Sequence, residues 1–297
     1  MPEVTRRRTG ELLRELFNIL IPQPEGVRAR EALTKLKEKM TLSDYENGTY
    51  ESGQSRFDQI VRFATVDSVK AGWMLKQKGV WIVTEEGKKA HSQLLDPEEF
   101  YRQAVKLYRA WKASQPGSEP ETVEEPDDSV SGKAVSITFE QAEEQAWGEI
   151  EQYLREMNPY DFQDLVASLL VAMGYHVTWV SPPGKDGGVD IIAWSDPLGT
   201  RPPRIKVQVK RVGQNVAVDG LRSFMALLGD DDVGLFVTTS GFTKDAQDEA
   251  RTQQSRKITL VDLQRLIELW IEYYDRLKDG DKRRLPLKPI YFMAPLT

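Results

Sequence analysis

The sequence predicts an α/β fold for the C-terminal half of the chain, a mixed sheet flanked by helices, preceded by a mainly helical domain. Between residues 159 and 274, segments with helical periodicity alternate with short apolar runs rich in β-branched residues, which is the pattern of a sheet covered by helices. Before residue 112, amphipathic helical segments precede a single β-like run. An acidic segment separates the two patterns.

The length and composition are those of a globular protein with two domains. The chain has 297 residues, of which 40% are hydrophobic and 29% are charged, and a domain of about 150 residues buries roughly two-thirds of its unfolded surface. No window approaches the ~18 uncharged apolar residues of a membrane span, and residues 1–10 lack the apolar core of a signal peptide. We therefore expect a cytoplasmic protein with no membrane partner.

The residue types that are rare or missing limit the chemistry. The chain has no cysteine and two histidines, His91 and His176, which lie far apart in sequence. These counts exclude disulfides and thiolate zinc sites, and they disfavour a Ser-His-Asp hydrolase. Hydrolysis would have to use carboxylates, amides, lysine and a hard cation such as Mg²⁺. The net charge of −6 still permits a local basic groove.

The segment that divides the chain is acidic and rich in proline. Residues 113–130 hold six acidic residues, three prolines and no basic residue, so this stretch cannot bury enough apolar surface to order itself. We expect a first domain at 1–112, an acidic flexible linker at 113–135, a second domain at 136–280 and a C-terminal tail at 281–297.

The first domain is typical of a winged helix. Helices are expected over 11–20, 27–40 and 55–72, followed by a β-like run at 80–84 that turns at Gly87. Residues 1–40 hold nine Lys or Arg against six Glu, which suits a module that docks on DNA through its phosphates. A helical dimerisation or partner domain with solvated charges explains the same residues equally well.

The second domain alternates helices with strands. A helix over 137–157 and another over 160–174, with Gly174 at its C-terminal cap, precede the first strand. Strands are expected over 175–180, 189–194, 204–211, 233–239 and 257–261. The helices between and after them are expected over 218–229, 243–254 and 262–274.

Polar residues gather where two of these strands begin and end. In a strand, residues two apart share a face, so Gln208 and Lys210 project together. Asp190 begins the preceding strand, directly after the Gly187-Gly188 turn. If the two strands pair through the loop at 195–203, then a carboxylate, an amide and an ammonium group surround one point.

This set of groups suits metal-assisted hydrolysis of a phosphodiester. The carboxylate holds a hard cation, the amide oxygen completes its coordination, and the lysine orients water or neutralises charge on phosphorus. Residues 201–211 also hold five basic residues and no acidic one, which favours contact with phosphates. They are Arg201, Arg204, Lys206, Lys210 and Arg211.

The motif D-G-G-V-D, followed by V-Q-V-K-R, resembles the Mrr-type restriction endonucleases, a branch of the PD-(D/E)xK nucleases. The resemblance extends over most of 155–275 and implies a restriction-endonuclease-like fold. It implies Asp190, Gln208 and Lys210 as catalytic residues, and Asp190 and Gln208 as ligands of Mg²⁺ or Mn²⁺, with Asp186 as an auxiliary. It also implies an N-terminal winged helix that engages duplex DNA. From the basic strip at 201–211 itself we expect DNA contacts at Arg201, Arg204, Lys206 and Arg211.

The chain departs from the family at the first core helix, where Gln163 stands in place of the usual glutamate. We include Gln163 as an auxiliary residue. The resemblance predicts an endonuclease that restricts modified or foreign DNA, with methylated duplex as one candidate substrate. Because a double-strand cut needs two sites, a dimer or tetramer is expected. The alternative is a non-cleaving DNA-binding or adaptor protein with a degenerate nuclease fold.

Overall fold

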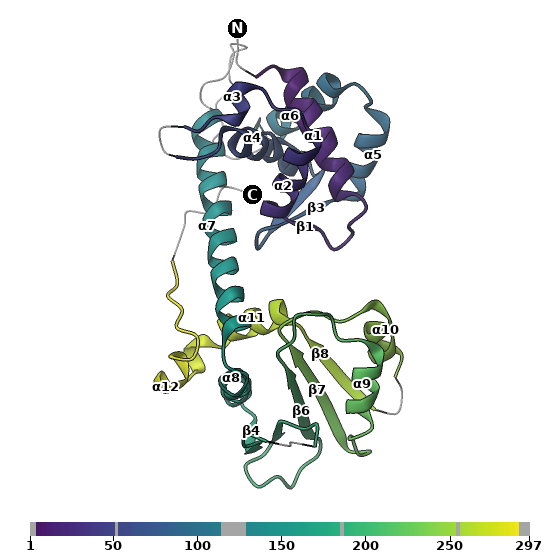
Figure 1. Ribbon diagram of the computed structural model, residues 1–297, viewed down its shortest axis with the longest axis vertical. Helices are drawn as coiled ribbons and strands as arrows, with labels where there is room; N and C mark the ends of the chain where they lie inside the picture. The colour runs from purple at the N-terminus through teal and green to yellow at the C-terminus, as the bar shows by residue number, and fades with distance from the viewer. Residues whose placement is uncertain (1–3, 51–52, 114–128, 185–186, 254–255, 291–297) are drawn as a thin grey trace. The chain divides into compact units, whose positions relative to one another are not determined.

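The computed structural model describes residues 4–50, 53–113, 129–184, 187–253 and 256–290 of the chain. The chain divides into two compact units, and each of them contains its own sheet (Figure 1). The division lies between Gly148 and Glu149, and the second unit runs to Ile290.

The N-terminal unit is mainly helical, as the sequence predicts. Its helices include α1 (Arg6–Leu20), α2 (Ala29–Lys39), the short α3 (Asp44–Asn47), α4 (Arg56–Lys70), α5 (Glu85–Gln93) and α6 (Pro97–Ala113). Its strands β1 (Val27–Arg28), β2 (Met74–Gln77) and β3 (Val80–Val83) form a sheet in the order β1-β3-β2. Helices followed by a hairpin, with the last strand central, are the arrangement of a winged helix. The sequence did not predict α3, α5, α6, β1 or β2.

Helix α1 lies at the centre of this unit's core. The hydroxyl of Thr5 caps the helix by accepting a hydrogen bond from the backbone amide of Arg8 at 3.1 Å. Leu16 and Phe17 are completely buried. Phe17 packs edge-on against Phe100 of α6, with ring centroids 5.2 Å apart. The apolar stripe that predicts the helix is therefore also the stripe that it buries.

The β2–β3 hairpin reverses at Lys78 and Gly79. Both residues have positive φ, 53° and 73°, as a two-residue type I′ turn requires. The predicted turn at Gly87 is wrong, because Gly87 lies in the first turn of α5 and donates its amide to the Thr84 hydroxyl at 3.0 Å. A β-carbon at Gly87 would lie 2.2 Å from the carbonyl oxygen of Trp73. Glycine at this position therefore permits close packing and not chain reversal.

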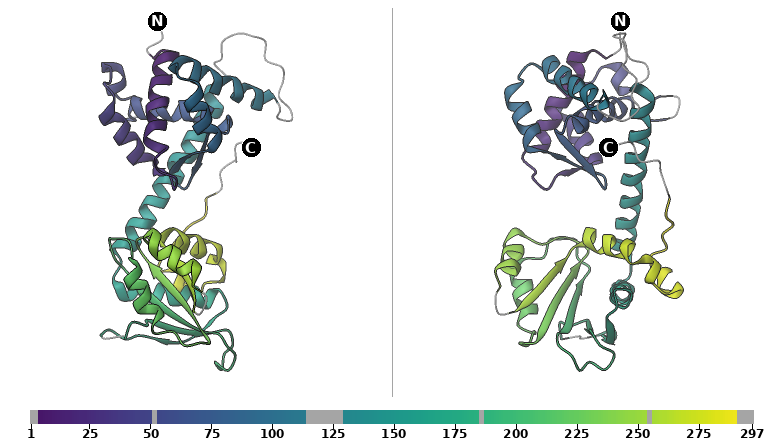
Figure 2. Two further views of the ribbon diagram at one scale, coloured as in Figure 1. Left: turned by 90° about the vertical axis from the view of Figure 1, so that its right-hand side faces the viewer. Right: turned by 180° about the vertical axis from the view of Figure 1, so that it is seen from behind.

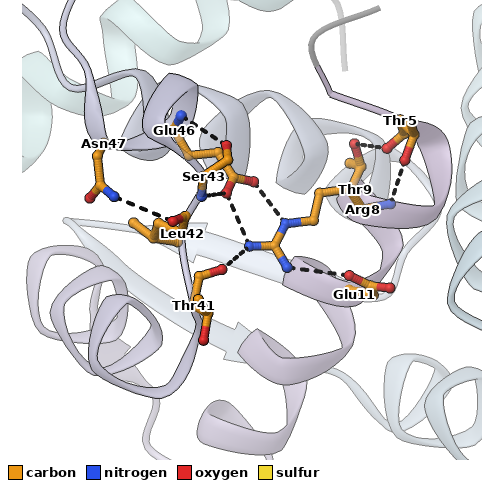
Figure 3. Close-up of polar contacts among 9 residues, drawn as sticks. All are labelled: Thr5, Arg8, Thr9, Glu11, Thr41, Leu42, Ser43, Glu46 and Asn47. Carbon is orange, nitrogen blue, oxygen red and sulfur yellow. Dashed lines mark hydrogen bonds and ion pairs between the residues drawn. The ribbon is translucent and has the colours of Figure 1, made fainter.

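A charged network connects the start of α1 to α3 (Figure 3). Glu46, with a side chain only 2% exposed, accepts hydrogen bonds from Arg8 Nε at 2.8 Å and Nη2 at 3.0 Å. Arg8 also donates to Glu11 and to the carbonyl of Thr41, while Ser43 and Glu46 form a capping box. Burial opposes the ionisation of Glu46, but these donors outweigh burial and hold the pKa of Glu46 below its usual value.

We expect Glu46→Gln to lower the free energy of unfolding by roughly 2–4 kcal/mol, because it breaks a buried ion pair. The loss stays below that of a fully buried pair, since Arg8 keeps 24% of its side chain exposed. Urea unfolding of the full chain, followed by circular dichroism, measures it. Glu11→Gln is the matched control: Glu11 is 39% exposed and holds the same arginine at 3.3 Å, so its loss should stay below about 1 kcal/mol. Equal losses in the two variants would contradict this interpretation.

The long helix α7 (Ser129–Glu156) begins earlier than the sequence predicts. Of the linker expected at 113–135, residues 114–128 lie outside the described residues, and 129–135 are helical. Helix propagation adds one backbone bond for each residue fixed, which allows this extension beyond the amphipathic part. The segment up to Gly148 belongs to the N-terminal unit, whereas the sequence assigns residues from 136 onwards to the second domain.

The C-terminal unit contains the predicted five-stranded mixed sheet. Its strands are β4 (His176–Val180), β5 (Ile191–Trp194), β6 (Arg204–Lys210), β7 (Asp232–Thr238) and β8 (Lys257–Val261), in that order across the sheet. The pairs β4–β5 and β5–β6 are antiparallel, and β6–β7 and β7–β8 are parallel. The helices include α8 (Pro159–Ala172), α9 (Val218–Met225), α10 (Lys244–Thr252) and α11 (Leu263–Glu272), with the short η1 (Tyr274–Arg276) and α12 (Asp279–Lys282) after them.

Helices cover both faces of this sheet. Helices α8 and α11 lie on one face and α9 and α10 on the other; in the left view of Figure 2, α9 and α10 stand in front of the strands. On the α9 face, Phe224 packs edge-on against Phe236 of β7, with ring centroids 5.5 Å apart. On the other face, Phe162 and Leu165 of α8 are completely buried. Gly174, which follows α8 with φ of 98°, confirms the predicted cap.

No helix within the described ranges combines the length and the apolar character that crossing a membrane requires.

Candidate active site

The pairing of β5 with β6 brings Asp190 beside Gln208. Ile191, the first residue of β5, pairs with Val207 in antiparallel register, and Asp190 directly precedes it. The backbone amide of Asp190 donates to Val207 O at 2.8 Å on the β6 side, while its carbonyl accepts from the Ser181 amide on the β4 side, so Asp190 departs from regular strand geometry. The amide of Val209 donates to Asp190 Oδ2 at 2.7 Å. Asp190 is only 6% exposed, so its carboxylate is held in place at the end of the sheet.

Gln208 carries an oxygen without a protein partner. Its Oε1 is buried and accepts no hydrogen bond from the described part of the chain, and such an atom normally has a partner. The Gly187-Gly188 turn passes close by: a β-carbon at Gly188 would lie 3.6 Å from Gln208 Nε2. Both glycines have positive φ, 65° and 86°. An amide oxygen beside a fixed carboxylate fits the oxygen ligands that Mg²⁺ and Mn²⁺ take.

Lys210 ends β6 on the same face as Gln208, because the two residues are two positions apart. Its Nζ lies 5.5 Å from the centre of the Phe236 ring. It is also near the first turn of α9, since a β-carbon at Gly220 would lie 3.8 Å from this nitrogen. The ammonium group is therefore placed by a strand, an aromatic ring and a helix, at the end of the sheet where Asp190 lies.

Gln163 supports this end of the sheet from α8. The side chain is 6% exposed, and its Nε2 donates to the carbonyl of Ser181 at 2.8 Å. The amide of Ser181 in turn donates to the carbonyl of Asp190 at 2.8 Å. Gln163 thus acts on Asp190 through the backbone of the residue after β4. No sequence pattern indicates Ser181, because its contribution is made by backbone atoms.

Carboxylates are scarce at this site. The predicted auxiliary Asp186 lies outside the described residues. Within the described residues, no group of three or more Asp, Glu, His or Cys side chains could hold a metal. A divalent ion beside Asp190 would therefore depend on the amide oxygen of Gln208, on water and on phosphate oxygens of a substrate. Mg²⁺ is commonly bound in this way, with one or two carboxylates and several waters.

Two of the predicted DNA-binding cations, Arg204 and Lys206, form ion pairs within the chain. Asp232, at the start of β7, accepts hydrogen bonds from Arg204 at 2.8 and 3.1 Å and lies 2.9 Å from Lys206 Nζ. Lys206 also donates to the carbonyl of Leu227 at 2.6 Å. Burial opposes the ionisation of Asp232, but bonds from Arg204, the Gly229 amide and Lys206 outweigh burial and hold the pKa of Asp232 well below its usual value. Arg204 and Lys206 are therefore already paired with the buried carboxylate of Asp232.

The remaining predicted cations lie at opposite ends of β6. Arg201 precedes the strand, and Arg211 follows Lys210 directly. At about 3.3 Å per residue, the seven-residue strand separates its two ends by roughly 20 Å. Arg211 donates to the carbonyl of Arg155 at 2.7 Å and is otherwise exposed. Only Arg211 among these four cations lies at the same end of the strand as Lys210.

Comparisons with known proteins agree with the two-unit arrangement. Residues 154–270 match the family described as restriction endonuclease, and residues 10–93 match the Mrr N-terminal domain family. The chain is 27% identical over 285 residues to the type IV methyl-directed restriction enzyme EcoKMrr of Escherichia coli strain K12, covering 88% of this chain and 91% of that protein.

A solved structure, the MspJI restriction endonuclease in complex with a 27-mer oligonucleotide, is 17% identical with a TM-score of 0.33. That match covers 64% of this chain and less than half, 44%, of the MspJI chain. The two family matches account for more than half of the sequence, one in each unit of the fold. The chain belongs to the Mrr-type restriction endonucleases.

Proposed function

We propose that this protein is a metal-dependent endonuclease that hydrolyses phosphodiester bonds in modified or foreign duplex DNA. The observation that supports the proposal is the 2.7 Å hydrogen bond from the Val209 amide to Asp190 Oδ2, which holds this carboxylate against the segment of β6 that carries Gln208. Within the described residues, Gln208 Oε1 is buried and accepts no hydrogen bond. Lys210 extends from the same face of the same strand. Asp190 and Gln208 would hold Mg²⁺ or Mn²⁺, and Lys210 would act on the phosphate.

The chain's own groups have separate tasks in this proposal. A divalent ion, when bound, would supply Lewis-acid activation of the phosphate and of the attacking water. The Val209 amide and the Gln163–Ser181 contact keep the Asp190 carboxylate oriented. Lys210 places a positive charge where negative charge develops on the phosphate oxygens, or orients the attacking water. Arg211, directly after it, would contact a neighbouring phosphate.

The substrate and the assembly are part of the same proposal. The Escherichia coli relative is described as methyl-directed, which supports methylated duplex DNA as the first substrate to test. A cut through both strands needs two active sites, and this supports a homodimer or tetramer. We place the protein in the cytoplasm, where foreign DNA is restricted.

Plasmid cleavage tests the proposal. Supercoiled DNA, methylated or unmethylated, is incubated with the full chain in Mg²⁺, Mn²⁺ or EDTA. We expect nicked and linear products only with metal, and a loss of at least about 100-fold in rate for Lys210→Ala. Lys257→Ala is the matched control, since Lys257 is an exposed lysine at the start of β8 in the same sheet, and it should cut like the wild type.

A second function has its own support. Asp190 is not part of an acidic cluster in the described residues, and position 163 offers an amide where the family usually has a carboxylate. A protein that binds DNA without cutting it would retain duplex in EDTA, would be insensitive to changes at Asp190, and would give no product with any substrate. That outcome would replace the nuclease proposal.

A further inference from the structure

The helix that is placed to read DNA has no exposed residue. In helix-turn-helix folds the second helix of the motif enters the major groove, and α4 holds that position in the N-terminal unit. Each residue from Arg56 to Lys70 is buried or half-buried. A helix that contacts bases needs an open face, so α4 cannot enter a groove in the arrangement that the structure describes.

Carboxylates of α7 form ion pairs with cations of α4 and of the β2–β3 hairpin. Glu140 Oε1 accepts from Arg62 of α4 at 2.7 Å and from Trp81 Nε1 of β3 at 2.8 Å. Its other oxygen, Oε2, accepts from Lys76 of β2 at 2.6 Å. Arg62 donates a second bond to Glu144 at 2.6 Å. One acidic face of α7 thus neutralises both α4 and the hairpin.

The tip of the hairpin is covered as well. Glu143 accepts a hydrogen bond from the backbone amide of Lys78 at 3.1 Å, and the Lys78 ammonium lies 5.3 Å from the centre of the Trp147 ring. A β-carbon at Gly79 would lie 3.2 Å from the β-carbon of Glu144. Glu140, Glu143 and Glu144 are spaced i, i+3, i+4, which places them on one side of the helix. We call these three residues the acidic stripe.

This contact is a poor way to stabilise a fold. The side chains of Arg62 and Glu140 are 6% and 9% exposed, and two charges buried together often contribute no more than apolar residues of the same size. Burial lowers the pKa of Lys76, and Glu140 offsets this only in part. Arg62 Nε is buried with no hydrogen-bond partner among the described residues. The cations here are therefore suited to exchange the carboxylates of α7 for the anionic groups of another partner.

We propose that the acidic stripe of α7 competes with the DNA phosphate backbone for Arg62 and Lys76, so that duplex binding by the N-terminal unit requires α7 to be displaced. The inference rests on the proposed function, because it assumes that the chain binds DNA. Carboxylate oxygens accept from guanidinium and ammonium groups as phosphate oxygens do. The cations that flank the stripe remain open: Arg30 and Lys37 of α2 are exposed and line a cavity of about 390 Å³ that Arg62 and Glu144 also border.

Removing the charge of the stripe tests the competition. We expect the full chain with Glu140→Gln and Glu144→Gln to bind a short duplex at least tenfold more tightly than the wild type, measured by fluorescence anisotropy in EDTA. Each cation released to a phosphate steepens the dependence of log K on log salt by about 0.9, so two cations should add about 1.8. Glu156→Gln is the control, since Glu156 is exposed near the end of the same helix and its carboxylate accepts a hydrogen bond from the neutral side chain of Gln152.

A reversible lock tests the same idea without removing Glu140. The chain has no cysteine, and the β-carbon separation at Gly79 and Glu144 is within a few tenths of an ångström of the ~3.5–4.5 Å found in disulfides. With Gly79→Cys and Glu144→Cys together, we expect the oxidised chain to bind duplex at least tenfold more weakly than the reduced chain. Gly79→Cys alone should respond to neither oxidant nor reductant.

The outcomes separate this inference from the nuclease proposal, because anisotropy in EDTA measures binding and not cleavage. Unchanged affinity and salt dependence in the charge variant, or equal binding by the oxidised and reduced lock, would overturn the competition even if the wild type cuts DNA. Tighter binding by the charge variant together with a wild type that cuts nothing would support the competition and reject the nuclease.

Discussion

Replacing Asp190 with asparagine is expected to reduce metal-dependent cleavage by about 1,000-fold or more while the fold is retained. A bound divalent ion typically contributes several kcal/mol to the transition state, and each 1.36 kcal/mol is a factor of ten in rate. Asparagine has nearly the same shape and keeps one carbonyl oxygen, so it can still accept from the Val209 amide, which now bonds Asp190 Oδ2 at 2.7 Å. The change therefore removes the charge and leaves the local backbone in place.

Metal binding should be measured beside cleavage, because a loss of activity alone has several causes. Calorimetry with Mn²⁺ is expected to show binding by the wild type in the presence of duplex DNA and none by Asp190→Asn, whereas DNA affinity in EDTA stays unchanged. Asp275→Asn serves as the control, since Asp275 is an exposed aspartate of η1. Cleavage by Asp190→Asn at the wild-type rate would remove Asp190 from the site and leave the metal without its carboxylate.

Local sequence patterns predicted most of the fold. Periodicity predicted α1, α2, α4, α8 and the five strands of the second sheet, although the edge strand β4 has no buried residue. Gly174 was predicted as a cap for a local reason, the positive φ that ends a helix. The prediction of a turn at Gly87 was wrong because glycine serves either to reverse the chain or to permit close packing. At this position it allows the backbone of Trp73 to approach, and the sequence does not show this contact because Trp73 lies 14 residues earlier.

The candidate site shows the same difference between local patterns, which the sequence reveals, and contacts between residues distant in sequence, which it does not. The alternation of β6 predicted that Gln208 and Lys210 share a face, and the hairpin hypothesis predicted the pairing of β5 with β6, which the structure has. The convergence of Asp190 with Gln208 and Lys210 around one point stays a prediction. The pattern of basic residues in 201–211 did not reveal that Arg204 and Lys206 are held by Asp232, 28 and 26 residues further along. That contact depends on the parallel pairing of β6 with β7, which no local spacing encodes.

Helix α7 is the clearest example of contacts that the sequence alone did not predict. Its acidic residues were expected in the second domain, on a helix next to a flexible linker. In the structure they neutralise α4 and the β2–β3 hairpin. Two surfaces of opposite charge in one sequence can attract each other, but sequence alone does not pair them. A count of charges along the sequence therefore does not show which cations of the N-terminal unit are already paired, as Arg62 and Lys76 are.

Asp232→Ala is expected to lower the free energy of unfolding by about 3–5 kcal/mol, the range for breaking a buried ion pair. Asp232 is 3% exposed and bonds Arg204, Lys206 and the Gly229 amide. Its removal leaves the ammonium of Lys206, 15% exposed, with the Leu227 carbonyl alone. Arg204 loses less, because it is 39% exposed and reaches water. Asp231→Ala, at an exposed neighbouring aspartate, should change the free energy by less than about 0.5 kcal/mol.

The same contact makes a prediction about pH, and its sign follows from the lowered pKa of Asp232. A carboxyl group whose pKa is lower in the folded than in the unfolded chain stabilises the fold above its unfolded pKa, near 3.9, and loses this contribution as the pH falls towards the folded value. The difference in unfolding free energy between the wild type and Asp232→Ala should therefore be constant from pH 7 to about 5 and shrink below about 4. Urea titrations across this range measure it. A difference that stays constant down to pH 2.5 would mean that Asp232 stabilises the sheet by packing and backbone hydrogen bonds, and that Arg204 and Lys206 are available to bind phosphate after all.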